Sequence, residues 1–592
     1  MNTIKTDVLV VGAGPAGLTA TALLARAGID AITITKYAGT ADSPRAHITN
    51  QRTVEVLRDL GVEDDLIAQA MPQHLMGAQI FATSFAGMEI GRMMAWGAGL
   101  DRRSDYLGAS PSAMCNIPQH KLEPVILGAA TRHRAEVRFN SELVRISQGR
   151  DAVHAIVLDR KEQAEYTIHA KYVIAADGAR SKVAEEIGFD FVGEAGVGEA
   201  ISVWLDADLT RFTKHRSGAV AFIAHQASDI WMSVWPCVTP WTEWNPFFFR
   251  HAWAPGPADH DILTGHIRDA IGDPSVEFNI KKITRWQVNH MVAARYRNGR
   301  VFLAGDAAHR HPPANGLGSN TSVQDAYNLS WKLALVLKGK ADEKLLDTYS
   351  TERQPIGRQV IDRAMRSVED VLPWSDAMGL RPKMTDAEAT ANLDELFGDT
   401  ERGADRREAV LASLKAMDFQ FNAHGIELGQ RYRDGALVSD HTPFPPYRRD
   451  PELFYQPTTH PGAYLPHAWV QDGHDWISTI DLARYDRFTL ITGIGGEPWI
   501  EAAAKVSDAL NVEIAAVPVG LRQPYGDVLG EWTALREVRD RGCILVRPDR
   551  VVAWRSMDRV DDPVGALRDV MLRLLGNRTA AVRTHEATGA IA

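Results

Sequence analysis

A glycine-rich turn near the start of the chain is the feature that most limits how it can fold. The apolar run Val8–Val11 is followed by the hexapeptide Gly12–Gly17 and then by the helical apolar pattern Leu18, Leu23 and Leu24. In a strand–turn–helix unit of this kind, the first glycine permits the turn, the second lets backbone approach a pyrophosphate, and the third allows close packing of helix on strand. The motif predicts a Rossmann-type unit that binds a dinucleotide.

The end of the next strand leaves the identity of the dinucleotide open. An acidic residue usually stands there and holds the adenosine ribose. Here the strand Ala31–Ile34 ends in Thr35 and Lys36, without a carboxylate. Lys36 could meet a ribose phosphate, which would favour NADP, or it could be a solvated lysine at a strand end.

Two later strands end in aspartate beside glycine. The first, in Lys171–Ser181, runs into Asp177-Gly178. The second, in Gly299–Asp306, ends in Gly305-Asp306 and continues through a loop rich in proline and glycine into the helical run Ser322–Leu337. Paired with the distant glycine motif, these strand ends favour a flavin over a nicotinamide dinucleotide.

Over roughly residues 5–360, the motifs and their order resemble the group A FAD-dependent aromatic hydroxylases, the family of para-hydroxybenzoate and phenol hydroxylases. The segment Pro44–Gly61 is similar to that of bacterial chlorophenol and 2-hydroxybiphenyl monooxygenases. The resemblance implies an α/β fold. In it, a Rossmann-type FAD-binding domain is interleaved with a β-sheet substrate domain, and a thioredoxin-like domain follows at the C-terminus.

The resemblance also implies roles for individual residues. Asp306 would accept hydrogen bonds from the ribityl hydroxyls of FAD, a role that suits a carboxylate. Pro313 would lie against the flavin ring, and Asp177 with Arg180 would contact both FAD and the incoming nicotinamide nucleotide. The expected cofactor-binding residues are Gly12, Gly14, Pro15, Ala16, Gly17, Thr35, Lys36, Arg45 (pyrophosphate), Gln119 (ribityl chain), Asp177, Asp306, Pro313, and the backbone amides of Gly318, Ser319 and Asn320 at the flavin pyrimidine edge.

His47 is the candidate catalytic base. In the related phenol hydroxylases an aspartate takes this place and is thought to help deprotonate the substrate hydroxyl. A phenol with a pKa of about 10 is a better nucleophile as phenolate, and an imidazole with a pKa of about 6.5 can accept its proton near neutrality. The alternatives are a hydrogen-bonded core histidine or one that only contacts flavin.

His309 and His311 have the spacing of a possible metal pair, but no carboxylate or cysteine cluster accompanies them. Zinc and other transition metals need such further ligands. We therefore expect no metal, and we expect both histidines to line or support the flavin site.

The stretch between the two aspartate motifs is rich in aromatic residues, and apolar alternations such as Ala219–Ile223 and Asp229–Trp235 predict strands. An aromatic wall suits a flat apolar ring and excludes water. Any single tryptophan is more often a core residue than a substrate contact. The aromatic residues are Trp204, Phe222, Trp231, Trp235, Trp241, Trp244, Phe247, Phe248, Phe249, Trp253 and Trp286. Trp286 is the best single pocket candidate and Pro313 is another, and His215 and Arg216 are weaker polar candidates.

Near the C-terminus, strand and helix patterns begin again after a proline-rich passage. Pro461–His467 and Leu545–Asp549 resemble the thioredoxin-like third domain of phenol hydroxylases. Because this region has no CxxC pair, it cannot perform dithiol exchange, and its role would be structural or in dimer contacts. The predicted domains are FAD-binding (1–185 and 290–375, with a substrate-domain excursion near 72–110), substrate sheet (186–289), helical or irregular linker (376–460) and thioredoxin-like (461–592).

Composition agrees with a large enzyme. The 592 residues are 45% hydrophobic and carry a net charge of −10, which gives no reason to expect nucleic acid or an anionic membrane as partner. Three scattered cysteines fit a reducing cytosol, and no leader or spanning segment is indicated near the N-terminus. We expect a cytoplasmic enzyme, as a homodimer or higher homo-oligomer.

The resemblance implies that NADH or NADPH reduces bound FAD, and that reduced flavin and O2 form a C4a-hydroperoxide. This hydroperoxide would hydroxylate a phenolic substrate, ortho to its hydroxyl, to give a catechol. Three alternatives stay open: a flavin-dependent halogenase, an FAD-linked dehydrogenase or oxidase, and a non-catalytic scaffold stabilised by flavin. The halogenase signature GWxWxIP is absent, and Trp241–Trp244 does not match it.

Overall fold

The structure is a computed structural model, and it divides into two compact units. It describes residues 3–224, 232–250, 260–380 and 384–576. Unit 1 comprises residues 1–330, 353–430 and 446–457, and unit 2 comprises residues 331–352, 431–445 and 458–592.

The first sheet of unit 1 carries the glycine motif. Its strands have the order β18-β19-β11-β1-β2-β8, and β1 (Thr3–Val11) pairs in parallel with both β2 (Ala31–Ile34) and β11 (Ala164–Ala175). The strands β18 (Arg297–Asn298), β19 (Val301–Leu303) and β8 (Glu136–Arg138) complete this order. Because β1, β11 and β19 run parallel, the ends of all three lie at one edge of the sheet, and each is followed by one of the predicted motifs.

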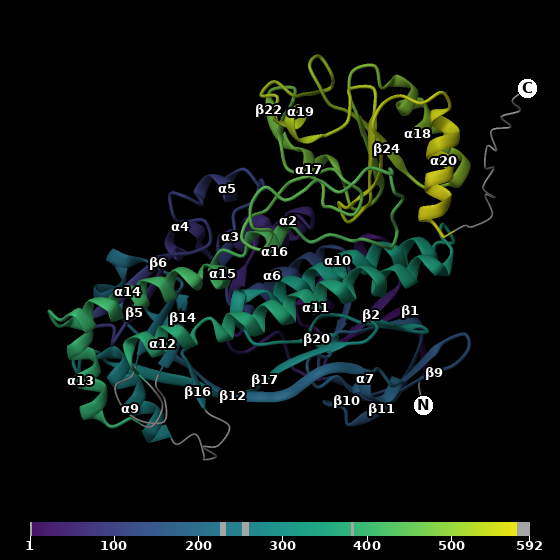
Figure 1. Cartoon of the computed structure of the whole chain (residues 1–592). Coiled ribbons are helices and arrows are strands. Elements are labelled where there is room, and N and C mark those ends of the chain that lie inside the picture. Colours follow the sequence, from purple (N-terminus) through teal and green to yellow (C-terminus); the bar gives the residue numbers. More distant parts are fainter. Residues whose placement is uncertain (1–2, 225–231, 251–259, 381–383, 577–592) are drawn as a thin grey trace, which may run out of the picture. The chain divides into compact units, whose positions relative to one another are not determined.

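A second sheet of unit 1 contains the aromatic stretch. Its longest strands, β12 (Phe191–Ala207) and β17 (Phe278–Ala293), form the long antiparallel ladder in Figure 1. Its order is β20-β17-β12-β15-β14-β13-β5-β6, and β16 also pairs with β12 and β14. The remaining bounds are β20 His309–Arg310, β15 Glu243–Trp244, β14 Met232–Thr239, β13 Val220–Ala224, β5 Ala78–Ala82, β6 Glu89–Met94 and β16 Phe247–Arg250.

Residues 376–460, which we predicted to form a helical or irregular linker, lie mainly in unit 1. Their helices follow α12 (Leu372–Met378) and belong to the same apolar core as the second sheet; Trp374 meets Phe81, and Phe421 meets Phe222. These helices are α13 (Asp386–Phe397), α14 (Glu401–Ala416) and α15 (Asp418–Phe421), and the short helix α16 (His424–Leu428) follows them. This segment is therefore a packed layer of the unit.

Unit 2 has thioredoxin-like topology. Its main sheet has the order β24-β23-β26-β27, with β23 (Phe488–Thr492) parallel to β24 (Ile514–Pro518) and antiparallel to β26 (Cys543–Val546). Helix α18 (Glu497–Leu510) joins the parallel pair, and α20 (Pro563–Leu574) follows β27 (Val552–Ser556). Together with unit 1, this topology confirms the predicted fold class.

A fully buried charge network explains the Arg-Pro-Asp sequence of unit 2. Arg547 makes two bonds to Glu352, both of 2.8 Å, and two to Asp549, of 2.9 and 2.6 Å. Lys332 adds a 2.7 Å bond to Glu352, and the side chains of Arg547, Glu352 and Lys332 have no exposed surface. Burial lowers the pKa of Lys332 to about 8, although Glu352 opposes the shift. The two cations and two anions compensate one another.

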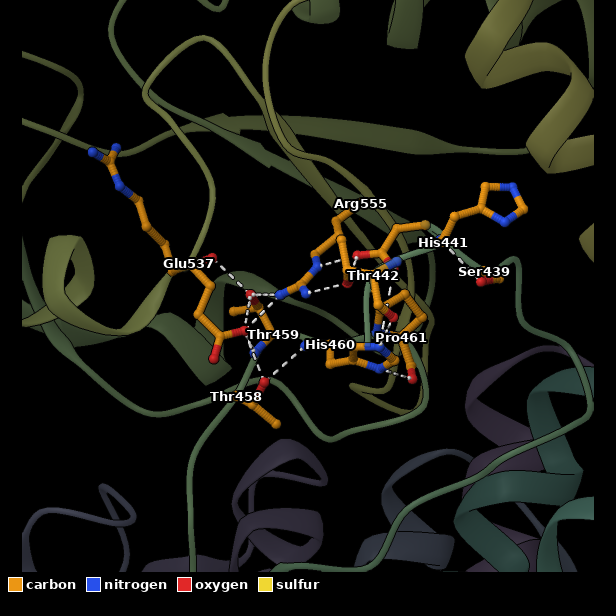
Figure 2. Close-up of polar contacts among 11 residues, drawn as sticks. Ser439, His441, Thr442, Thr458, Thr459, His460, Pro461, Glu537 and Arg555 are labelled. Carbon is orange, nitrogen blue, oxygen red and sulfur yellow. Dashed lines mark hydrogen bonds and ion pairs between the residues drawn. The ribbon is translucent and has the colours of Figure 1, made fainter. Parts of the chain in front are cut away.

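A second arginine holds the loops beside β27 (Figure 2). The Arg555 guanidinium donates to Asp440 and to Glu537, both over 2.5 Å. It also donates to the hydroxyls of Thr459 and Thr442, at 3.0 and 3.1 Å. Arg555 is buried and every bond serves a loop of the same unit, so we assign the cluster a structural role.

The cysteines and the helix lengths can be compared with what the composition suggested. Cys115, Cys237 and Cys543 are buried free thiols. Within the described ranges, no helix combines the length and apolar character needed to cross a bilayer.

Candidate active site

The turn Gly12–Gly17, which we call the cradle, has space for a ligand at one of its three glycines, Gly14. Gly12 has a φ of +107°, and an added Cβ there would lie 2.1 Å from the Ala176 carbonyl oxygen. At Gly17 it would lie 1.9 Å from the Gly12 carbonyl oxygen, whereas at Gly14 the nearest atom is Glu123 Oε1, 3.9 Å away. The backbone at Gly14 therefore faces open space at the N-terminus of α1 (Pro15–Arg26), where unpaired amides favour an anion.

The two distant motifs meet at Ala16 and Gly305. A Cβ added to Gly305 would lie 3.2 Å from Ala16 Cβ, and Asp306, next in the chain, is exposed. The Gly305 amide donates to Asp325 Oδ2 over 3.0 Å, and Asp325 also binds His309 Nε2 at 3.0 Å and Arg353 Nε at 2.8 Å. Asp325 thus holds the turn that presents Asp306.

Asp177 lies two residues after the end of β11 and stands beside Gly12. Its Oδ2 accepts from the Val183 amide over 3.2 Å, whereas its buried Oδ1 has no hydrogen-bond partner within the described residues. Burial raises the pKa of the Asp177 carboxyl above its ordinary value. A buried carboxylate oxygen of this kind is available to accept a hydrogen bond from a bound ligand. Arg180, which we predicted to act with it, is exposed.

Glu123 contacts Gln119 and lies near both Arg45 and the open position at Gly14. Gln119 Nε2 donates to Glu123 Oε1 over 2.6 Å, and the Ala41 amide donates to Glu123 Oε2 over 2.5 Å. Burial raises the pKa of Glu123, while these two bonds and the nearby Arg45 guanidinium oppose the rise. Our sequence reasoning missed Glu123, although a carboxylate one helical turn after Gln119 was a signal.

The residues after β2 separate into a buried and an exposed one. Thr35 is buried, and its carbonyl accepts from the Ser141 amide over 2.8 Å. Lys36 is exposed, with its ammonium 5.6 Å from the centre of the Tyr37 ring. Of these two residues, only Lys36 therefore presents a charged side chain.

The loop after Asp306 leads into α10 (Gly318–Leu337). Pro313 is exposed, and the His311 ring lies beside Gly318, 3.3 Å from an added Cβ. Burial lowers the pKa of His311 to about 4. Gly318, Ser319 and Asn320 form the first turn of α10, where amides lack acceptors within the helix. The predicted amide donors are therefore available in this turn.

Asn320 ties this loop to the strand that follows His47. Its side-chain amide donates to the Ile48 carbonyl over 2.9 Å and to the Gly316 carbonyl over 2.6 Å, and its Oδ1 accepts from the Asn50 amide over 3.0 Å. Ile48 belongs to β3 (Ile48–Thr49), which pairs with β7 (Cys115–Asn116). The fold thus brings the predicted base and the predicted flavin loop together.

His47 is half-buried, with one ring nitrogen engaged. Its Nδ1 lies 2.8 Å from Asn116 Oδ1. Burial lowers the pKa of His47 to about 4, and the bond with Asn116 opposes the shift. The ring is therefore neutral at pH 7, but it holds a proton more weakly than the ordinary value of about 6.5 assumed from sequence.

Trp286 lies on the face of the second sheet nearer to the flavin loop. Its indole donates to Ser202 Oγ over 2.8 Å and makes an edge contact with Phe247, with ring centres 5.8 Å apart. In the sheet, Phe247 pairs with Val234, and Val234 pairs with Phe222 on the next strand, so the three side chains lie on the same face. Phe421 packs against Phe222 on this face. Just before Phe421, the carbonyls of residues 419 and 420 accept bonds from Asn315 of the loop, at 2.7 and 3.2 Å.

The other aromatic and polar candidates lie elsewhere. His215 is exposed in the short turn η1 (Lys214–Arg216), so we leave it out of the pocket. Arg216 is buried in structural contacts, including a 2.8 Å ion pair with Glu89. Trp231 and Trp253 fall outside the described residues.

The cradle and the loop define a dinucleotide-binding enzyme, and comparison with known proteins identifies its kind. Residues 5–364 match the FAD binding domain, and residues 458–577 match the C-terminal domain of aromatic-ring hydroxylases. The chain therefore belongs to the FAD-dependent aromatic-ring hydroxylases. The predicted family, cofactor and monooxygenase activity are confirmed, and the alternatives of a dehydrogenase, a halogenase and a scaffold are not favoured.

Similar proteins span nearly the whole chain. The 2,4-dichlorophenol 6-monooxygenase of Delftia acidovorans is 41% identical, over 97% of this chain and 98% of its own. The phenol 2-monooxygenase of Pseudomonas sp. strain EST1001 is 43% identical, over 96% and 93%. A crystal structure of the flavin-dependent monooxygenase PieE with FAD and substrate shares 44% identity and a TM-score of 0.94, covering 98% of this chain and all of that one.

The open position at Gly14 gives a direct test of cofactor binding. We expect Gly14→Ala to fold normally, because the new methyl meets no protein atom closer than 3.9 Å, but to weaken FAD binding by about tenfold or more by occupying the pyrophosphate side. Flavin fluorescence titration of the apoprotein measures the affinity. Gly128→Ala is the matched control, since an added Cβ there also meets nothing within 4 Å. Equal FAD affinity in Gly14→Ala and the wild type would contradict the assignment.

Proposed function

We propose that this flavoprotein hydroxylates a phenol at the carbon next to its hydroxyl group, giving a catechol. The observation that carries the proposal is the imidazole of His47, neutral and half-buried, tied through Ile48 and Asn320 to the predicted flavin loop. Two relatives, a 2,4-dichlorophenol 6-monooxygenase and a phenol 2-monooxygenase, are named for adding oxygen at the ring carbon next to the one that carries the hydroxyl group. We infer the same regiochemistry here.

In this proposal the cradle and the strand ends hold FAD. Gly14 and the amides of α1 would hold the pyrophosphate, with Arg45 supplying positive charge. Asp306 would accept hydrogen bonds from the ribityl hydroxyls, and Gln119, oriented by Glu123, would support the same chain. Lys36 and Thr35 lie at the adenosine end, and Asp177 offers its unpaired oxygen to FAD and the reductant.

When bound and reduced by NADH or NADPH, FAD supplies the activated oxygen atom. The first-turn amides of Gly318, Ser319 and Asn320 would donate to the negatively charged edge of the reduced ring, and their fixed direction would lower the cost of that charge. Pro313 would pack against the ring. Trp286 forms part of the aromatic wall that keeps water from the reacting atoms.

His47 acts on the substrate. Its free ring nitrogen accepts the hydroxyl proton, so that charge flows into the ring and builds on the ortho carbon. A base with a pKa of about 4 is too weak to ionise the phenol beforehand. We therefore expect the proton to move as the ring attacks oxygen, when the forming phenolate charge beside the imidazole raises the pKa of His47.

A substrate panel tests the function. Purified yellow enzyme, NADH or NADPH and a series of mono- and dichlorinated phenols are combined, and reductant oxidation, oxygen uptake and catechol are measured in the same vessel. We expect phenol-stimulated oxidation with nearly one catechol formed per reductant. Stimulation that yields mainly hydrogen peroxide would show that phenols only trigger reduction, and would contradict the assigned substrate class.

The predicted cytoplasmic location and homodimer stay predictions. The three buried free thiols are consistent with a reducing compartment. Light scattering on the purified protein tests the oligomeric state.

A further inference from the structure

We propose that Asn116 is a positioning residue that keeps the His47 proton on Nδ1, so that Nε2 is the ring nitrogen able to accept the substrate's proton. This inference rests on the proposed function, because it concerns how the proposed base is prepared for the reaction.

Contacts on the nitrogen side of Asn116 fix the direction of its side chain. Nδ2 lies 2.9 Å from the Cys237 carbonyl oxygen and 3.7 Å from Met71 Sδ. A carbonyl and a thioether can only accept, so the amide NH2 must face them. Asn116 is 1% exposed, which leaves little room for the flipped amide. The amide oxygen therefore faces His47.

An amide oxygen can only accept, so the 2.8 Å contact requires a proton on His47 Nδ1. In the neutral ring, Nε2 then carries the lone pair. Backbone geometry holds the ring in place, because the Ile117 amide donates to the His47 carbonyl over 2.7 Å and β3 pairs with β7. A polar chain thus runs from the Cys237 carbonyl through Asn116 to His47.

The surroundings of the ring contribute little charge. The thiols on the paired strand β7 and on β14 are those of Cys115 and Cys237, and burial raises the pKa of both, to about 12 for Cys115, so both stay neutral. The remaining neighbour on this small sheet is β4 (Met71–Pro72), which brings no titratable group. Arg45, two residues before His47, is exposed. Asn116 is therefore the polar group that controls the ring.

A neutral amide has a chemical advantage over a carboxylate at this position. A carboxylate would stabilise the imidazolium and keep the ring protonated near neutral pH, whereas an amide fixes the tautomer without trapping the proton. During turnover the phenol O–H bond breaks, its electron pair stays on oxygen, and a new N–H bond forms at Nε2. The imidazolium returns this proton to the same oxygen when the product ring regains aromaticity, while the displaced ring proton passes to water.

The first test removes the hydrogen bond between Asn116 and His47 with little change in the volume of the side chain at position 116. We expect Asn116→Leu to lower kcat for catechol formation by about tenfold or more, because the His47 proton would no longer be held on Nδ1. KM for the phenol should change less than about threefold. Asn245→Leu is the matched control: Asn245 is 3% exposed and donates from its side chain to the Pro44 carbonyl over 3.3 Å. We expect the control to keep wild-type kcat.

A second variant retains the acceptor but adds charge. We expect Asn116→Asp to keep the tautomer and to hydroxylate at pH 9 within about threefold of wild type. Its carboxylate raises the pKa of His47, so the acid limb of kcat/KM should move to higher pH by about one unit or more. An acid limb that does not move would overturn the proposal.

A double-mutant cycle separates positioning from a general effect on folding. In a His47→Gln background, Asn116→Leu should cause no further loss, because the residue acts through His47. Equal losses in both backgrounds, or wild-type kcat in Asn116→Leu, would overturn the role of Asn116 while leaving the proposed function intact. If the wild-type enzyme forms no catechol from any phenol, the proposed function fails, and the role of Asn116 fails with it.

Discussion

Replacing His47 with glutamine is expected to slow ring hydroxylation by about 100-fold or more, the usual contribution of a general base, while the protein stays yellow. Glutamine can hydrogen-bond to Asn116 but cannot take a proton at neutral pH. FAD affinity should not change, because the proposed cofactor contacts lie in the cradle and the loop. Single-turnover formation of catechol, measured together with the flavin content, gives the result.

The pH dependence makes the assignment of His47 more specific. The folded-state pKa of about 4 lies below the ordinary 6.5, so the neutral, active form should persist as the pH falls below 6, where an ordinary histidine would be largely protonated. Activity should decline only on approach to the lower value. His133→Gln, at an exposed histidine, is the control. An unchanged hydroxylation rate in His47→Gln would rule out His47 as the base.

Replacing Arg547 with methionine is expected to lower the free energy of unfolding of unit 2 by about 3–5 kcal/mol, because it leaves buried carboxylates without their partner. Glu352 would lose both of its bonds to Arg547 and keep those to Lys332 and to the Ala436 amide, while Asp549 would lose both of its bonds to Arg547. This loss of stability comes from burying carboxylates that have lost an ion-pair partner. It does not measure the net contribution of the intact network to the free energy of folding.

Urea unfolding followed by circular dichroism measures the change. Arg568→Met is the control, since Arg568 is 56% exposed and its 3.7 Å pair with Asp569 should contribute at most about 1 kcal/mol. Arg547→Lys should give an intermediate loss, because lysine keeps the charge but not the paired bonds. An Arg547→Met protein as stable as the control would contradict the structural role of the network.

Local patterns predicted the elements of the fold well because they depend on neighbouring residues. The apolar run before Gly12 became β1, the run Ala31–Ile34 became β2 with the same bounds, and the helix expected over Ser322–Leu337 begins four residues earlier, at Gly318. The helices after α12 were taken for a linker because their charged faces dominate the composition, whereas their buried faces pack on the aromatic sheet.

The side chains that orient the site could not be predicted in the same way. Asn116 is 69 residues from His47, and Glu123 meets the Ala41 amide across 82 residues. These contacts depend on strand pairing and on the direction of single amides, which spacing along the chain does not contain. Asp325 sits in a helix where one buried acid has no distinctive pattern.

Asn320 has a consequence for how enzymes of this kind can diversify. The side-chain amide of Asn320 bridges the carbonyls of Gly316 and Ile48, so it sets the spacing between the proposed flavin loop and the strand that follows the proposed base, His47. The aromatic wall around Trp286 and Phe247 belongs to a separate sheet. Substitutions in the aromatic wall can therefore adapt the pocket to larger or smaller rings, while the contacts of Asn320 keep the distance between the Gly316 and Ile48 segments unchanged.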